Sequence, residues 1–390
     1  MKNTNSAFPK PNAFIYYLLN YIMRFFLWLK LRPTYKLDEI RKAKGPAIIL
    51  CSHTSNLDFL LVSTGLLPLR PTYIMSNHFF EHPKIGKVLA PLHAIPKKMF
   101  CADINAVRQI MKAIKAGNIV IMFPEGRLSC CGHTLPIADG TAELIKKLGV
   151  DVYCLVENGL YKTLPKWGKA GIRKGPVSVE GSLLMSGDEI SSLSVAEIED
   201  KIAQAIKHDD EKAFVGREYK CSKPALGLDR ILYKCPVCGE EFTISSTAYT
   251  LDCSSCGASW TLDNKYVLSG PRFDSINDWF DWEQSEIDLD AGLECDCLLG
   301  SADETGVMDP TAGKGHISIN KEEICFSGEC FGKELSFAEK TSIVKAFPIA
   351  VGEHIDIYSN RILYYIYPQP NKSMTAKCVQ YLDKLTAQSR

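Results

Sequence analysis

The sequence contains no internal repeat, no low-complexity tract and no long uninterrupted apolar run. Hydrophobic residues make up 46% and charged residues 23% of its 390 positions, which is ordinary for a folded protein. This composition excludes wholesale disorder, collagen and a polytopic membrane protein. At about 100–200 residues per domain, the length predicts two or three domains.

Net charge is also absent, because 45 Lys and Arg balance 45 Asp and Glu. The balance hides an asymmetry along the chain. Residues 1–100 carry 14 basic and 4 acidic side chains, whereas residues 274–304 carry 11 acidic and no basic ones. A basic front part suits an anionic substrate or a membrane surface. The acidic stretch predicts a solvated segment between domains.

No signal-peptide cleavage site follows the first apolar segment, and the number of cysteines, 15, is odd. Both features argue against a secreted disulfide framework and favour a reducing, cytosolic environment. Four of the cysteines have the spacing of a metal site.

The apolar segment at 14–31 is rich in aromatic residues and is interrupted by Asn20, Arg24 and Lys30. A membrane-spanning helix needs about 20 mostly apolar residues, and Arg24 in the middle argues against a simple span. The composition favours a helix that lies in the bilayer interface; a docked core helix and a single span are the alternatives. We therefore predict a membrane-associating helix at 1–33 and a protein at the cytoplasmic face of a membrane, peripheral or monotopic.

Short apolar strands alternate with amphipathic helices between residues 34 and 215. Strands are expected at 46–52, 71–76, 118–123 and 150–156, and helices at 57–67, 103–116, 140–148 and from 194 onward. Asp103 and Ser194 are of the types preferred at helix N-caps, and Glu197 can complete a capping box with Ser194. The alternation predicts an α/β domain in which a mixed sheet is flanked by helices.

The first candidate motif, Ser52-His53-Thr54-Ser55-Asn56-Leu57-Asp58, follows the first of these strands. Binding crevices of open α/β sheets form at the carboxyl ends of strands. Across a tight turn, the Asp58 carboxylate can reach one ring nitrogen of His53, fix its tautomer and stabilise the imidazolium. The other nitrogen can then take a proton from a hydroxyl. A satisfied core histidine is the alternative interpretation.

The second motif, Phe123-Pro124-Glu125-Gly126-Arg127-Leu128-Ser129, also follows a strand and is therefore expected at the same sheet edge. Gly126 permits close approach of the backbone, and Arg127 offers a fork-shaped donor for phosphate. Glu125 can accept hydrogen bonds from the hydroxyls of a polyol. A Pro-Gly turn with solvated charges is the alternative interpretation.

In this order and about 70 residues apart, the two motifs resemble the 1-acylglycerol-3-phosphate acyltransferase family, the lysophospholipid acyltransferases of glycerolipid synthesis. That family's first motif is N-H-x-x-x-x-D and its third is F-P-E-G-T-R-S. The resemblance covers roughly residues 30–210. It implies that His53 is the general base and that Asp58 is its orienting partner.

The resemblance also implies that Glu125, Gly126 and Arg127 bind the acceptor substrate. The family's second motif supplies an arginine, whereas the corresponding segment here ends in two lysines. Lys97 or Lys98 is therefore the expected phosphate contact.

Two further positions depart from the family's motifs. Ser52 stands where the first motif has asparagine, and the strand at 150–156 lacks the proline that is usual in the fourth motif. These departures bear on the acceptor more than on the reaction class.

Four cysteines form the pattern C-x2-C, fourteen residues, C-x2-C: Cys235, Cys238, Cys253 and Cys256. Four thiolates on two knuckles make a closed tetrahedral site, so we expect structural zinc in a zinc ribbon at 230–268. Acidic residues surround the ribbon, and this argues against nucleic acid as a partner because phosphate contacts need basic residues.

Residues 285–390 contain several short strand patterns followed by one amphipathic helix. The clearest strand patterns lie at 316–328, 333–340 and 354–367, and the prolines at 368 and 370 are expected to end the last one. This order predicts a small β-rich module that resembles the pleckstrin-homology fold.

Together these features predict a membrane-associated acyltransferase with its acyltransferase domain at 34–215. It would transfer a fatty acyl group from a thioester, either acyl-CoA or acyl carrier protein, to a hydroxyl of lysophosphatidate or a related lysophospholipid. No nearby Ser or Cys resembles a covalent nucleophile, so the substrate hydroxyl would attack directly. The thioester carries the activation, so no redox cofactor is expected. The alternative is a catalytically degenerate, acyltransferase-like scaffold whose zinc ribbon and C-terminal module bind partners.

Overall fold

The structure, a computed structural model, describes residues 8–81, 83–98, 103–303, 307–344 and 346–388. The chain divides into two compact units, one made of residues 1–165 and 172–220 and the other of residues 166–171 and 221–390. The opening residues of the predicted 1–33 segment and the last two of the C-terminal module lie outside the described ranges.

The first unit is built on a seven-stranded sheet with the strand order β1-β7-β6-β2-β5-β3-β4. The strands are β1 Thr34–Lys36, β2 Ala47–Cys51, β3 Thr72–Ser76, β4 Ile95–Lys97, β5 Ile119–Met122, β6 Asp151–Asn158 and β7 Ser178–Met185. The five strands from β6 to β4 are parallel, whereas β7 runs antiparallel to β6. The predicted mixed sheet is therefore confirmed.

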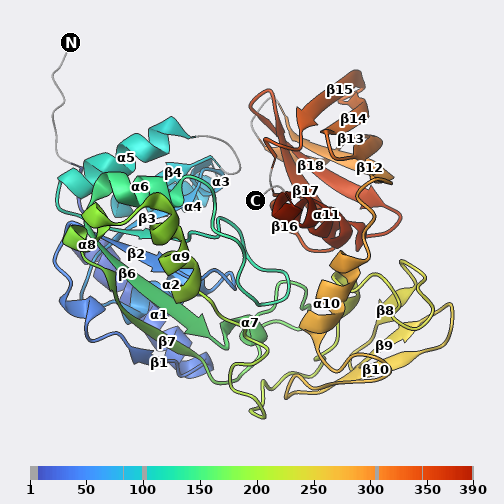
Figure 1. The fold of residues 1–390 in the computed structure, drawn as a ribbon, viewed down its shortest axis with the longest axis horizontal. Helices are drawn as coiled ribbons and strands as arrows, with labels where there is room; N and C mark the ends of the chain where they lie inside the picture. The colour runs from blue at the N-terminus through green and yellow to red at the C-terminus, as the bar shows by residue number, and fades with distance from the viewer. Residues whose placement is uncertain (1–7, 82, 99–102, 304–306, 345, 389–390) are drawn as a thin grey trace. The chain divides into compact units, whose positions relative to one another are not determined.

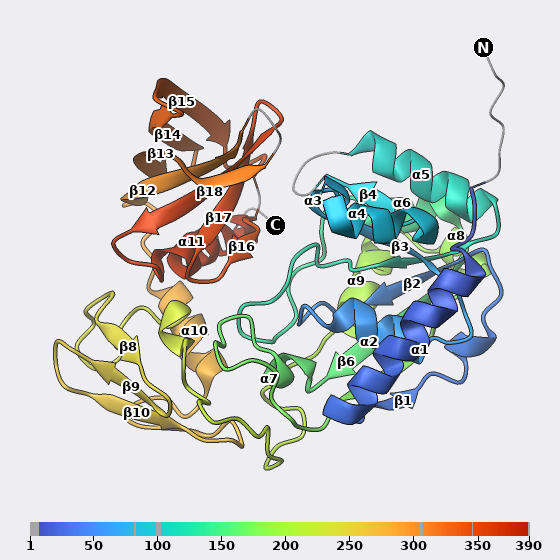
Figure 2. The same cartoon turned by 180° about the vertical axis from the view of Figure 1, so that it is seen from behind.

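Helices cover both faces of this sheet. They are α1 Ala13–Lys30, α2 Asp58–Gly65, α3 His78–Glu81, α4 Pro83–Leu89, α5 Ile104–Lys115, α6 Thr141–Leu148, α7 Leu160–Thr163, α8 Gly187–Ser192 and α9 Val195–Ala205, with short 3-10 turns at Ile40–Lys42 and Ala90–Leu92. Figure 2 shows α1 and α2 on one face, and Figure 1 shows α9 on the other.

The central strand β2 explains this layering. All five of its residues are buried, as expected for a parallel strand that is covered on both faces. Ile49 packs in the apolar cluster that includes α1 and α2, whereas Ile48 and Leu50 pack in the cluster of α5, α6 and α9. The two-residue period of the strand thus divides one apolar segment between two cores.

The predicted helix starts are confirmed by their caps. The Asp103 carboxylate accepts a hydrogen bond of 3.0 Å from the backbone N–H of Ala106. At the start of α9, Ser194 Oγ accepts from the N–H of Glu197 at 3.2 Å, and Glu197 Oε2 accepts from the N–H of Ser194 at 2.7 Å. These bonds satisfy N–H groups that have no partner within the helix.

Helix α1 makes polar contacts with α2 beside the apolar cluster that the two helices share. Asn20 is buried and bonds to Ser63 of α2, and the hydroxyls of Tyr16 and Ser63 lie 3.3 Å apart. Asn20, which interrupts the apolar run, is therefore used in a buried contact with the neighbouring helix. Among the described residues, no helix has the length and apolarity needed to cross a membrane.

The second unit begins with a four-stranded antiparallel sheet in the order β11-β10-β9-β8. Its strands are β8 Ile244–Ser246, β9 Thr250–Cys253, β10 Ser259–Leu262 and β11 Leu268–Ser269, preceded by a 3-10 turn at Leu228–Arg230. The four predicted metal ligands lie in this part of the chain, with one pair before β8 and the other at the end of β9 and just after it.

A larger antiparallel sheet follows, with the order β15-β14-β13-β12-β18-β17-β16. Its strands are β12 Leu293–Ala302, β13 Met308–Ile319, β14 Glu323–Cys330, β15 Lys333–Lys340, β16 Ile349–Ala350, β17 His354–Ser359 and β18 Ile362–Gln369, and helix α11 Met374–Gln388 ends the described chain. The β-rich C-terminal region is confirmed. Strand β18 runs through Pro368, contrary to expectation, because its pairing with β17 stops at Ile366 and Pro368 pairs only with Cys297 of β12.

The acidic stretch is not the solvated segment that its charge predicted. It forms helix α10 Ile276–Ser285 and much of β12. Trp279 and Glu283 are fully buried on α10, and the Trp279 Nε1 group donates to the carbonyl of Lys234 at 3.0 Å. Apolar residues at helical spacing within the stretch outweigh its charge, because the acidic side chains between them can face solvent.

We expect Trp279→Ala to lower the free energy of unfolding of the second unit by about 3–5 kcal/mol, because the indole is fully buried and lies 4.6 Å from the Trp260 ring. Urea unfolding of the full chain, followed by tryptophan fluorescence and circular dichroism, measures the change. Tyr249→Ala is the matched control, since that side chain is 52% exposed and should cost under about 0.5 kcal/mol. Equal losses in the two variants would contradict the assignment of Trp279 to the core.

Candidate active site

The two sequence motifs meet because β2 and β5 are neighbouring parallel strands. The loop after β2 carries His53, and the loop after β5 carries Phe123 and Glu125. Carboxyl ends of parallel strands lie at one edge of a sheet, so the loops are adjacent. The backbone N–H of Ser129 donates to the carbonyl of His53 at 3.3 Å, and the rings of His53 and Phe123 lie 4.4 Å apart.

His53 and Asp58 form a hydrogen-bonded pair. Nδ1 of His53 lies 2.7 Å from Oδ2 of Asp58. The Asp58 side chain is 1% exposed and the His53 side chain is 26% exposed, so the carboxylate is enclosed while the imidazole reaches solvent. Since Nδ1 is engaged, Nε2 is the nitrogen available to a substrate hydroxyl.

Backbone donors hold Asp58 in this position. Its carboxylate accepts hydrogen bonds from the N–H groups of Thr54 at 2.9 Å and Ser55 at 2.8 Å. Burial raises the pKa of Asp58, and the bonds from His53, Ser55 and Thr54 oppose that rise. The arrangement can fix the tautomer of His53 and stabilise its protonated form.

Glu125 joins the two motif loops. Its Oε1 accepts from the backbone N–H of His53 at 2.8 Å, and its Oε2 accepts from the N–H of Leu135 at 2.7 Å. The side chain is 5% exposed, and burial raises the pKa of Glu125 to about 8. Both carboxylate oxygens are thus used within the protein, while the expected contact with the acceptor stays a prediction.

The other predicted substrate contacts lie along the same sheet edge. Gly126 has a left-handed φ of 71°, and Arg127 is 8% exposed. Lys97 ends β4 and Lys98 follows it. Because β4 is two strand spacings from β5, these lysines lie on the order of 10 Å from the second motif. That separation is compatible with a phosphate bound away from the reacting hydroxyl.

The structure adds two buried carboxyl groups that the sequence analysis did not single out. Glu157 near the end of β6 and Asp210 are both 0% exposed. The Asp210 carboxylate accepts from the N–H groups of Gly159 at 2.7 Å and Tyr161 at 2.6 Å, and burial raises its pKa to about 7. The sequence gives no signal for Asp210, because its hydrogen-bond partners are about 50 residues away. Glu157 directly follows the apolar segment 150–156, and this position at the end of a predicted strand is a weak signal of a site residue.

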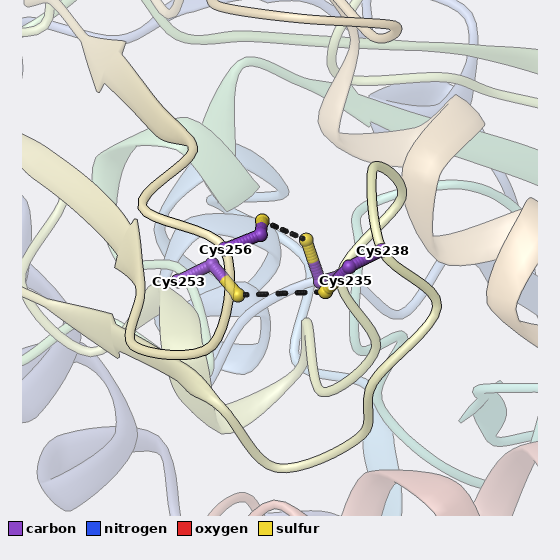
Figure 3. Close-up of side chains that lie close together, drawn as sticks. All are labelled: Cys235, Cys238, Cys253 and Cys256. Carbon is purple, nitrogen blue, oxygen red and sulfur yellow. Dashed lines mark hydrogen bonds between the residues drawn. The ribbon is translucent and has the colours of Figure 1, made fainter.

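The four predicted metal ligands gather in the second unit. Their sulfur atoms all lie within 4.8 Å of one another, with Cys235 and Cys256 3.7 Å apart and Cys238 and Cys253 3.8 Å apart (Figure 3). Zinc–sulfur bonds of about 2.3 Å give a tetrahedron with edges of about 3.8 Å. The two shortest contacts match this edge, so the cluster could hold a zinc ion on four thiolates.

An open hollow of about 760 Å³ lies on the C-terminal sheet, among residues that include Asp296, Lys314, His316 and Glu334. The histidine–carboxylate pair that lines it, His316 with Asp296, is exposed on both partners. A base held by an exposed partner lacks the fixed geometry found at His53. The candidate active site is therefore the sheet edge in the first unit.

Comparisons with known proteins point to the same region. A family model described as Acyltransferase matches residues 32–156. A chloroplastic 1-acyl-sn-glycerol-3-phosphate acyltransferase BAT2 of Brassica napus is 25% identical over 168 residues, which cover 41% of this chain and 48% of the relative. A 1-acyl-sn-glycerol-3-phosphate acyltransferase of Bacillus subtilis is 29% identical over 79 residues, or 20% of this chain and 40% of the relative.

The crystal structure of the 1-acyl-sn-glycerophosphate acyltransferase PlsC of Thermotoga maritima aligns with 48% of this chain and 77% of its own, at a TM-score of 0.41 and 18% identity. The matches span half or less of the length of these curated relatives. The family model ends at residue 156, so the four-cysteine cluster and the C-terminal region lie outside it. Over residues 32–156, the comparisons confirm that the chain resembles the 1-acyl-sn-glycerol-3-phosphate acyltransferases, as its two motifs predicted.

Proposed function

We propose that the chain transfers a fatty acyl group from an acyl thioester, acyl-CoA or acyl carrier protein, to a hydroxyl of lysophosphatidate or a related lysophospholipid. The observation that carries the proposal is the buried Asp58 carboxylate 2.7 Å from Nδ1 of a partly exposed His53. A scaffold that had lost its chemistry would not need an enclosed carboxylate behind an accessible imidazole. The family match over the same residues supports the reaction class.

The proposed reaction is a direct displacement. Nε2 of His53 takes the proton of the acceptor hydroxyl as its oxygen attacks the thioester carbonyl. Asp58 stabilises the imidazolium through Nδ1. The carbon–sulfur bond then breaks, the thiolate leaves with its electron pair, and the proton on His53 returns to that sulfur. A new oxygen ester and a free thiol are the products.

Basic residues at the same edge suit the acceptor's phosphate. Arg127 follows the second motif's glycine, and Lys97 and Lys98 lie at the end of β4. We assign phosphate binding to these three side chains, with the hydroxyl directed toward His53. Guanidinium and ammonium groups both bind phosphate, the first in a fixed fork geometry.

The exposed side of α1 supports attachment to a membrane surface. Five large apolar residues follow a helical spacing and are 49–75% exposed: Phe14, Leu18, Tyr21, Phe25 and Trp28. Arg24, Lys30 and Arg32 are also exposed on or beside this helix. An apolar stripe next to cationic groups is typical of helices that lie in the interface of an anionic bilayer.

We further propose that Cys235, Cys238, Cys253 and Cys256 hold one structural zinc ion. When bound, the metal would cross-link the two loops that carry the cysteines. It would take no part in catalysis, because four protein ligands leave no open coordination position. In the same unit, seven antiparallel strands closed by α11 support assignment of the C-terminal module to a pleckstrin-homology-like fold.

His53→Ala should lower kcat by about 10²–10⁴-fold, because it removes the general base. Formation of phosphatidate from labelled acyl-CoA and lysophosphatidate measures the rate, and circular dichroism checks the fold. His316→Ala, on the C-terminal sheet, should behave as wild type. Near-normal turnover by a folded His53→Ala enzyme would rule out the mechanism, and no turnover by wild type with either thioester would rule out the function.

Replacing both Leu18 and Phe25 by Ser should weaken binding to anionic lipid vesicles about tenfold or more, since each large apolar side chain contributes about 1.5–3 kcal/mol when fully buried. Vesicle sedimentation of the full chain measures the effect. Ile104→Ser is the matched control, because Ile104 is 65% exposed but belongs to α5 on the other face of the sheet. Undiminished binding by the double variant would assign the membrane contact to another surface.

Protein purified without chelators should contain about one zinc ion per chain, and Cys253→Ser should contain less than about half an equivalent. The second unit should also unfold more readily in this variant, because the ribbon's apolar core is small. Elemental analysis and urea unfolding measure the two effects. Cys221→Ser, outside the cluster, should retain the metal; a zinc content that did not distinguish the variants would contradict the site.

A further inference from the structure

Glu157 contacts Ser52, the residue that precedes His53 in the loop after β2. It is the penultimate residue of β6, which pairs with β2, and it is fully buried. The backbone N–H of Glu157 donates to Ser52 Oγ at 3.1 Å, and the same hydroxyl lies 3.4 Å from Glu157 Oε2. Ser52 stands where the family's first motif has asparagine, and Glu157 directly follows the segment 150–156, which lacks the proline of the fourth motif. One of the departures, Ser52, is therefore in contact with Glu157.

Four carboxyl groups are buried in this region, and their hydrogen bonds differ. Asp58 accepts two backbone N–H bonds and pairs with His53. Glu125 and Asp210 each accept two backbone N–H bonds. Glu157 has only the hydroxyl of Ser52 near one oxygen, and its other oxygen, Oε1, has no partner among the described residues.

This difference makes Glu157 the member of the group that is least able to release its proton. A buried carboxylate needs donors or a cation, and each backbone N–H bond favours the charged form. Three of the four groups have such donors, whereas within the described chain Glu157 has none beyond the hydroxyl. We infer that Glu157 acts as an uncharged carboxylic acid, hydrogen-bonded to Ser52, that fixes the position of the adjoining His53. It is a positioning residue and does not touch the substrate.

The charges around Glu157 point the same way. Burial, followed by the charges of Asp58 and Asp210, raises the pKa of Glu157 well above its ordinary value of 4.5, and Glu125 adds to the rise. Burial raises the pKa values of Cys51, Tyr35 and Tyr73, which also interact with Glu157, so these side chains supply no positive charge that could stabilise its carboxylate. The buried amine of Lys162 acts on Asp210 and donates to the carbonyls of Glu211 and Ala213. Ionisation of Glu157 would therefore place an uncompensated charge under the base.

Stability as a function of pH tests the inference without requiring turnover. In the native state Glu157 keeps its proton, whereas the unfolded chain releases it above the ordinary carboxyl pKa of 4.5. In the pH window between that pKa and the raised pKa of the native state, the free energy of unfolding therefore falls as pH rises. Relative to wild type, Glu157→Gln should gain about tenfold in its folding equilibrium constant for each pH unit within the window. Urea unfolding of the full chain from about pH 5 to about pH 9 measures this gain.

Asp210→Asn is the matched control. Its side chain would turn one oxygen that accepts a backbone N–H into a donor, so this variant should be less stable than wild type throughout the pH range. Infrared spectra at about pH 9, above the pKa of about 8 of Glu125 and of about 7 of Asp210, add a direct readout, because the carbonyl band of the protonated Glu157 carboxyl should be missing in Glu157→Gln. An unchanged spectrum, or a pH dependence of stability identical to that of wild type, would overturn the inference.

The kinetic test rests on the proposed function. Ser52→Ala and Glu157→Leu should each lower kcat about tenfold with little change in KM, the size of one lost hydrogen bond. The double variant should lose no more than Ser52→Ala, because that substitution already removes the hydroxyl to which the Glu157 carboxyl group is bonded. In Glu157→Gln, the ratio of kcat at about pH 9 to that at about pH 7 should rise. Additive losses would show that the two residues act separately, which would overturn the positioning role even where the spectrum confirms the proton.

Discussion

Glu125 constrains the candidate active-site edge of the first unit, because it joins loops that follow different strands. One carboxylate oxygen accepts a hydrogen bond from the backbone N–H of His53, and the other accepts one from the N–H of Leu135. Residues 52–57 and 123–140 are all described, and neither loop contains a helix or strand that could hold His53 by itself. Glu125 holds the backbone at His53, Thr54 and Ser55 donate their N–H groups to Asp58, and Asp58 in turn contacts Nδ1 of the imidazole. Enclosure of the Glu125 carboxylate also accounts for its raised pKa.

The elements that local chemistry determines could be predicted from the sequence. The caps at Asp103 and Ser194, the buried strand β2 and the contact of His53 with Asp58 depend on residues a few positions apart. Contacts between distant residues could not be predicted. Glu157 reaches Ser52 across 105 positions, and sequence alone cannot show the two backbone N–H groups from which Glu125 accepts hydrogen bonds. Charge was misleading for α10, where buried aromatic residues outweigh the surrounding carboxylates.

Helix α1 shows how one segment can meet two opposite requirements. Its buried side carries Asn20, which is hydrogen-bonded to Ser63. Either polar group would cost free energy if it were buried in an apolar contact without its partner. This polar contact fixes the rotation of the helix about its own axis. The rotation in turn decides which aromatic residues face outward, so the apolar stripe depends on a polar residue that lies on the opposite side.

Helix α10 has a practical consequence for dividing the chain into fragments. One side of the helix packs on the ribbon through Trp279 and Trp260, and Glu283 accepts from the N–H of Lys234 at 2.7 Å. The other side meets α11, where Gln380 donates to the carbonyl of Phe280 at 2.8 Å. A fragment boundary placed between the ribbon and the C-terminal sheet would deprive one of them of part of its core. Expression of residues 221–390 as one piece respects this packing, whereas the cysteine pattern taken alone would suggest a cut near residue 268.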